Sequence, residues 1–140
     1  PIGAVLMNKK VANSCTPGSH GSTYAGSPLA TTVGNAVLDQ VLKKGFLNKV
    51  LKLSEYFING LNKIKNKYPK IIKEIRGKGF LIGIQLHFNQ SKFIKSLEKK
   101  NLLTIRASEN VVRVLPPLNI QKREIDLALK IIEHVCKNYK

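Results

Sequence analysis

The chain has 140 residues, 43% of them apolar, and a formal net charge of +16 at pH 7. This length suits one domain or part of a larger one, and the apolar share is typical of folded proteins, which argues against disorder. No apolar run approaches the roughly 20 residues that a membrane-spanning helix needs. The two widely spaced cysteines suit reduced thiols, so we expect a cytoplasmic protein.

The positive charge is carried mainly by lysines, which are spread along the whole chain. The arginines are Arg76, Arg106, Arg113 and Arg123. Proteins that bind nucleic acids rely on the planar fork of arginine and on aromatic residues that stack on bases, and this sequence shows neither pattern. We therefore expect a solvated lysine-rich surface and no nucleic-acid or membrane partner. A basic nucleic-acid-binding module stays the alternative from a different functional class.

The first part of the chain predicts a strand, a loop and a helix. The apolar run IGAVLM at 2–7 suits a buried strand. A loop rich in glycine and serine follows at 18–26. Beyond it, Ser27 is a good helix N-cap and Pro28 is tolerated in a first helical turn. Apolar residues then recur at helical spacing until Gly45, which is a natural helix stop.

A second amphipathic helix is expected from Leu47 until shortly before Pro69. The pattern then alternates. It predicts a strand at 79–86, a helix at 91–101, two short strands in LLTIR and VVRVL that resemble a hairpin, and a final amphipathic helix at 122–138. Strands that alternate with helices indicate the α/β class from about residue 70 onward.

The cysteines and histidines predict no metal site. Cys15 and Cys136 lie far apart, and the three histidines show no spacing typical of metal ligands. We expect both thiols to be reduced. Cys136 lies on the apolar stripe of the last helix, where cysteine behaves as a small hydrophobic residue.

The glycines of RGKGFLIG do not match a dinucleotide-binding fingerprint. The spacing of Gly77, Gly79 and Gly83 is wrong, and the segment leads into a strand rather than out of one. A turn with glycines at positive φ is the simpler interpretation.

The loop at 18–26 is a candidate phosphate site. Ser22 and Thr23 offer adjacent hydroxyls, and the neighbouring glycines leave backbone N–H groups accessible. Such donors suit a phosphate group. The alternative is a plain surface loop.

Segments along nearly the whole chain resemble class III (subgroup II) pyridoxal-phosphate-dependent aminotransferases. They are PIGAVLMNKKVA, GSHGSTYAGSPLATTVGNAVLDQVL, IRGKGFLIGIQL, NVVRVLPPL and IQKREIDLAL, in the order of that family. The resemblance implies the C-terminal part of a fold type I pyridoxal-phosphate-dependent transferase. Residues 1–45 would end the large cofactor-binding domain, 46–69 would form a connecting helix, and 70–140 would form the small C-terminal α/β domain.

The resemblance is closest to the family members that act on N-acetylornithine. It implies a homodimeric enzyme, with pyridoxal 5′-phosphate at the subunit interface, that moves an amino group between N-acetylornithine and 2-oxoglutarate in arginine biosynthesis. Ornithine, succinyl-diaminopimelate and 4-aminobutyrate are the alternative donors. The lysine that binds the cofactor covalently is expected shortly before Pro1, so no catalytic residue is assigned in this sequence, and the 140 residues alone are expected to be inactive.

The resemblance also implies binding roles for three residues. Thr23 would donate to the cofactor phosphate across the dimer interface, and Ser22 would line the substrate pocket beside it. Arg113 would bind a substrate carboxylate, for which the rigid fork of arginine is suited. The alternative for Arg113 is a strand arginine paired with a nearby carboxylate. Arg76 is expected to stabilise its turn, and the role of Arg106 stays open.

Overall fold

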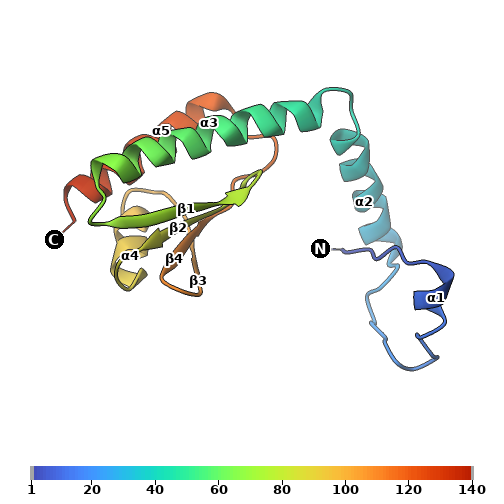
Figure 1. Ribbon diagram of the computed structural model, residues 1–140. Helices are drawn as coiled ribbons and strands as arrows, with labels where there is room; N and C mark the ends of the chain where they lie inside the picture. Colours follow the sequence, from blue (N-terminus) through green and yellow to red (C-terminus); the bar gives the residue numbers. More distant parts are fainter. Residues whose placement is uncertain (1, 140) are drawn as a thin grey trace. The chain divides into compact units, whose positions relative to one another are not determined.

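The computed structural model describes residues 2–139 (Figure 1). It divides into two units, the first ending at Phe46 and the second beginning at Leu47. Pro1, before which the cofactor-binding lysine is expected, lies outside the described residues. The assignment of the units to a large domain, a connecting helix and a small domain stays a prediction.

The first unit holds two helices and a long loop. Helix α1 (Lys9–Ala12) is followed by the loop and by α2 (Pro28–Val41). The strand predicted at 2–7 is wrong, because these residues form no ladder and their side chains are exposed. A buried strand needs neighbours that accept and donate its backbone hydrogen bonds, and the described part of this unit supplies none.

Helix α2 begins at the predicted residue. Ser27 occupies the N-cap position, but its side chain makes no capping bond, and its carbonyl accepts from the amide of Thr31 at 2.9 Å. The helix ends at Val41, before Gly45, whose φ of 86° starts the turn into the next helix. No residue of α2 is buried, so its apolar side chains contribute to no core within residues 2–139.

The second unit is an antiparallel sheet with helices against one face (Figure 1). The strand order is β1 (Ile72–Lys78), β2 (Leu81–Leu86), β4 (Val111–Val114) and β3 (Ile105–Ala107). The helices are α3 (Phe46–Lys67), α4 (Ser91–Glu98) and α5 (Lys122–Lys137), and α3 and α5 lie along the sheet (Figure 1). The predicted helices and the hairpin-like strand pair are therefore confirmed, with small shifts of their ends.

Strand β1 was not predicted from the sequence. The pairing of β1 with β2 shifts its register between Ile72 and Glu74, so the apolar residues Ile72 and Ile75 do not follow the usual alternation. Charged residues fill the remaining positions. A strand at the edge of a sheet with one irregular step lacks the period of two on which sequence prediction depends.

All of the buried apolar core belongs to the second unit as far as residues 2–139 are described. Every helix and three of the four strands of that unit contribute to it. Its largest fully buried apolar side chains are Phe57, Leu61, Ile72, Ile82, Ile84, Leu86, Phe93, Leu97, Val112, Ile125 and Ile132. Cys136 joins this core with 2% exposure, and burial raises the pKa of its thiol to about 12, as expected of a structural cysteine.

Neither a membrane span nor a metal centre is found in the described part of the chain. No helix there is long and apolar enough to cross a bilayer. No group of three or more histidine, cysteine, aspartate or glutamate residues is placed to hold a metal ion within residues 2–139.

Residues 47–139, expressed alone, are expected to fold cooperatively, because this segment contains the whole buried core described above. A domain of this size is stabilised by on the order of 5 kcal/mol. Urea unfolding followed by circular dichroism should give one transition with native-like near-ultraviolet signal. A segment that binds hydrophobic dyes and unfolds without a transition would contradict this expectation.

Candidate functional site

The loop at 18–26 is exposed along its length and is shaped by short-range backbone bonds. The amide of Ala25 donates to the carbonyl of Ser22 at 3.2 Å, and the amide of Ser27 donates to the carbonyl of Tyr24 at 3.3 Å. These two overlapping turns hold the backbone on either side of Thr23. The sequence reasoning placed the loop correctly, since glycine and serine at this density favour turns.

Ser22 and Thr23 present donors that are free to bind a ligand. Within residues 2–139 neither hydroxyl has a hydrogen-bond partner, and the amides of Gly21, Ser22 and Thr23 donate to no acceptor. The space around Gly21 is open, because a Cβ there would meet no atom within 4 Å. Adjacent hydroxyl and amide donors without acceptors suit an anion such as a phosphate group, so the donor set fits the predicted cofactor phosphate.

Arg113 lies on β4, in a row of paired residues that runs across all four strands of the sheet. It pairs with Gly83 of β2 and with Ile105 of β3, and Gly83 in turn pairs with Arg76 of β1. Directly paired residues share a face of a sheet. Val112 and Val114, which point to the opposite face, are buried. Arg113 therefore lies on the face of the sheet away from its core.

The guanidinium of Arg113 is exposed and has no hydrogen bond or ion pair within residues 2–139. The nearest carboxylate along the chain, that of Glu109, bonds to Arg76 instead, with 2.9 Å between Arg76 Nη2 and Glu109 Oε2. The alternative in which Arg113 is paired with a nearby carboxylate is thus not seen in the described residues. Its fork is free for a ligand.

Arg76 binds a residue of a distant turn, and no contact of its guanidinium with its own turn is seen within residues 2–139. Glu109 belongs to the turn between β3 and β4, so the ion pair joins the first strand of the sheet to a distant hairpin. The hydrogen bond and charge of Arg76 hold the pKa of Glu109 below its usual value. Sequence reasoning missed Glu109. The signal was present, because the three polar residues Ser108, Glu109 and Asn110 separate the short strands, a length common in hairpin loops.

Two hollows on this part of the sheet include Arg113. One, of about 380 Å³, is lined by Arg76, Gly83 and Arg113, among others. The other, of about 520 Å³, is lined by Glu109, Arg113 and the β3 end of the hairpin. Arg106, which pairs with Val112 in the ladder, also lines this second hollow.

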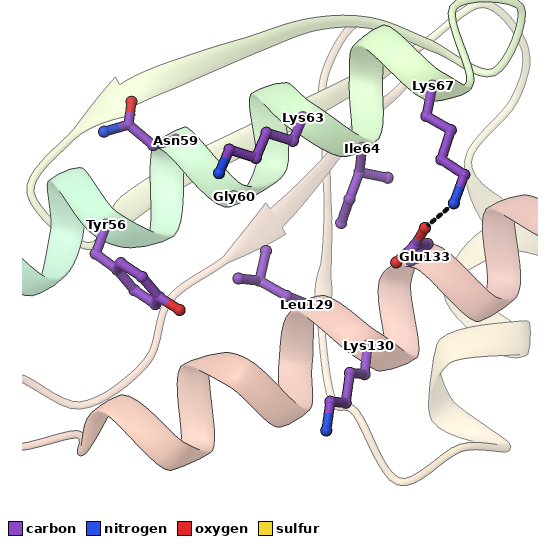
Figure 2. A pocket seen from close by; sticks show the side chains of 9 residues that line it. All are labelled: Tyr56, Asn59, Gly60, Lys63, Ile64, Lys67, Leu129, Lys130 and Glu133. Atoms are coloured by element: carbon purple, nitrogen blue, oxygen red, sulfur yellow. Dashed lines mark hydrogen bonds and ion pairs between the residues drawn. The ribbon is translucent and has the colours of Figure 1, made fainter.

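A groove between α3 and α5 is the other marked hollow of the second unit (Figure 2). It has a volume of about 460 Å³, and the ion pair between Lys67 and Glu133, 2.5 Å long, crosses it. Gly60 lets the helices approach, since a Cβ there would lie 2.5 Å from Leu129 Cδ1. None of the predicted site residues lines this groove, and we assign it to helix packing.

The chain matches the family model "Aminotransferase class-III" over residues 1–136. Curated acetylornithine aminotransferases are similar to it. That of Agrobacterium fabrum is 43% identical over 133 residues, which are 95% of this chain and 33% of the relative. That of Clostridium acetobutylicum is 44% identical over 138 residues, which are 98% of this chain and 35% of the relative. The chain thus spans about a third of the length of these relatives.

Solved structures of aminotransferases share the fold. The acetylornithine aminotransferase of Elizabethkingia anophelis superposes with a TM-score of 0.81 at 30% identity, covering 96% of this chain and 36% of that one. The ornithine aminotransferase of Plasmodium yoelii superposes with a TM-score of 0.83 at 29% identity, with the same coverage.

Proposed function

This chain belongs to the class III aminotransferases, and on that basis we propose that it forms part of an enzyme that transfers an amino group between N-acetylornithine and 2-oxoglutarate. The fold prediction is confirmed, since the mixed α/β structure matches solved aminotransferases of this kind. Because the chain spans about a third of its curated relatives, the activity, substrates and partners proposed here are those of the whole protein.

The similarity to curated acetylornithine aminotransferases over almost the whole chain carries this proposal. Ornithine is the second candidate donor, because ornithine aminotransferases are among the similar solved structures. To test the choice, the full-length enzyme should be assayed with each donor and 2-oxoglutarate. We expect the larger kcat/KM with N-acetylornithine. A larger value with ornithine would replace the proposed donor and leave the reaction class unchanged.

We propose that Thr23 and Ser22 bind at the cofactor end of the site and that Arg113 binds a substrate carboxylate. Pyridoxal 5′-phosphate, when bound, supplies the electron sink of the reaction. The hydroxyl of Thr23 donates to its phosphate, and Ser22 lines the substrate pocket beside it. The fork of Arg113 orients the substrate through both carboxylate oxygens. We further propose that the enzyme is a cytoplasmic homodimer of the arginine biosynthesis pathway.

Thr23→Val in the full-length enzyme is expected to weaken cofactor binding and to preserve the fold, because valine keeps the shape and β-branching of threonine without its hydroxyl. A hydrogen bond to a charged phosphate contributes about 1.5–3 kcal/mol, so the cofactor dissociation constant should rise by about one to two orders of magnitude. The measurement is a cofactor titration of the apoenzyme. Thr23→Ser is the matched control, and it should bind cofactor nearly as tightly as wild type.

Mixed dimers test whether Thr23 acts across the interface. One subunit would carry Thr23→Val and the other a substitution of the upstream cofactor-binding lysine. If Thr23 serves the partner's site, the site with an intact lysine receives a normal threonine and should bind cofactor with wild-type affinity. Weak binding at that site would mean that the loop serves its own subunit.

A further inference from the structure

Two arginines and a glycine form one row across the face of the sheet away from its core. Arg76, Gly83 and Arg113 are directly paired on β1, β2 and β4. Neighbouring strands lie about 4.8 Å apart, so the backbones of the two arginines are separated by about 10 Å. The side chain of Val111 lies against Gly83, since a Cβ there would be 3.0 Å from Val111 Cγ1, and all three residues of the row line the same hollow.

Glu109 binds one of these arginines and shares a hollow with the other. Its carboxylate binds Arg76 at 2.9 Å. It also lines a hollow together with Arg113, which follows it by four residues and lies on β4. Within residues 2–139 the carboxylate is paired with Arg76 alone, and Arg113 has no partner.

The turn that carries Glu109 is fixed without the help of Arg76. Glu109 and Asn110 have φ of 58° and 60°, as do the central residues of a type I′ turn, and the amide of Val111 donates to the carbonyl of Ser108 at 3.2 Å. The amide side chain of Gln85 donates to the carbonyl of Glu109 at 3.1 Å. The backbone amide of Leu86 donates to the carbonyl of Asn110, also at 3.1 Å. Loss of Arg76 would therefore release the carboxylate of Glu109 and leave its backbone in place.

Gln90 holds the other side of this hairpin. Its Nε2 donates to the carbonyl of Ala107 at 2.7 Å, and the residue is only 1% exposed.

The remaining carboxylate near Arg76 is that of Glu74, which lies on the outermost strand β1 and pairs with Gln85 rather than with Gly83. Glu109 is thus the carboxylate best placed to reach Arg113.

We propose that Arg76 is a positioning residue that sequesters the carboxylate of Glu109 and so keeps the guanidinium of Arg113 available for the substrate carboxylate. This inference rests on the proposed role of Arg113. A carboxylate tethered four residues away acts at an effective concentration in the millimolar range, which is enough to compete with a substrate. The ion pair of Arg76 removes that competitor.

Three variants of the full-length holoenzyme test the proposal: Arg76→Gln, Glu109→Gln, and the two combined. With 2-oxoglutarate as the varied substrate, Arg76→Gln should raise KM about fivefold to tenfold and leave kcat within twofold of wild type. The reason is that the released carboxylate of Glu109 competes with substrate binding and not with the chemical step. Glu109→Gln should leave KM at or below the wild-type value. The double variant should restore the wild-type KM, since the competing charge is gone.

The restoration separates competition from a structural or direct binding role. If the double variant keeps the raised KM of Arg76→Gln, or if Arg76→Gln changes nothing, the proposal is overturned. Arg76→Lys, which keeps a partner for Glu109, should have a KM near wild type, and thermal midpoints of all variants show whether each is folded. Arg113→Lys is measured in parallel. If Arg113→Lys changes no KM, the proposed role of Arg113 fails. If Arg113→Lys raises KM and Arg76→Gln does not, only the sequestration of Glu109 by Arg76 is overturned.

Discussion

Gly77→Ala is expected to destabilise the second unit by about 2–4 kcal/mol, from strained backbone and overpacking together. Gly77 has a φ of 144°, which residues with a side chain rarely adopt. A Cβ there would lie 2.1 Å from the carbonyl oxygen of Leu81 and 3.0 Å from Ile82 Cα. These are backbone atoms of the paired strand, and they cannot move away without breaking the ladder between β1 and β2.

Gly79→Ala is the matched control for this prediction. Gly79 also has a positive φ, 57°, but a Cβ there would meet no atom within 4 Å. The left-handed backbone alone costs about 1–2 kcal/mol. Urea unfolding of the full-length enzyme or of residues 47–139 should therefore rank wild type above Gly79→Ala and Gly79→Ala above Gly77→Ala. Equal losses in both variants would show that backbone conformation, and not the contact with Leu81, sets the cost.

The long amphipathic helices were predictable because each carries its own apolar stripe. Helix α5 was expected at 122–138 and spans Lys122–Lys137, and α2 starts at Pro28 as expected. Periodicity reports on one face of one element, and it located both helices, although no residue of α2 is buried within residues 2–139. It failed at 2–7, where an apolar run has no neighbouring strand in the described residues, and at β1, where an irregular step in the pairing hides the alternation.

The candidate site residues could be proposed from the sequence only where they stand together in one segment or match a family motif. Ser22 and Thr23 stand together in one loop, and their hydroxyl chemistry is visible in the letters. Glu109 differs, because its significance comes from Arg76, which lies 33 residues away and reaches it only through the strand order. Strand order depends on long-range pairing, which a single sequence does not specify.

The surface lysines form local pairs that the net charge alone does not reveal. Lys122 donates to Asp126 at 2.9 Å and to the hydroxyl of Tyr56 at 3.0 Å. The hydroxyl of Tyr56 donates to Asp126, and this bond and the bond from Lys122 hold the pKa of Asp126 below its usual value. Exposed pairs of this kind are screened by solvent and are typical of a solvated surface. They support the interpretation of the lysines as surface residues and supply no arrangement for stacking bases.

Arg113→Lys in the full-length enzyme is expected to lower kcat/KM by about 10-fold to 150-fold, which corresponds to the loss of about 1.5–3 kcal/mol for one charged hydrogen bond. Lysine keeps the positive charge but is a point donor, so it cannot bind both carboxylate oxygens in the geometry of the guanidinium fork. The position is favourable for such a contact, because the fork of Arg113 has no partner within residues 2–139 and lies beside Gly83.

Arg123→Lys is the control for Arg113→Lys, since Arg123 is an exposed arginine of α5 that lines neither of the hollows that include Arg113. It should leave kcat/KM within about twofold of wild type, as surface substitutions usually do. Each variant is assayed with the amino donor and with 2-oxoglutarate varied in turn, because the fork is proposed to bind the carboxylate that each presents. A loss confined to one substrate would assign Arg113 to that half of the reaction. Equal, small effects of both arginine variants would show that Arg113 has no contact with either substrate and that the carboxylate is bound elsewhere in the protein.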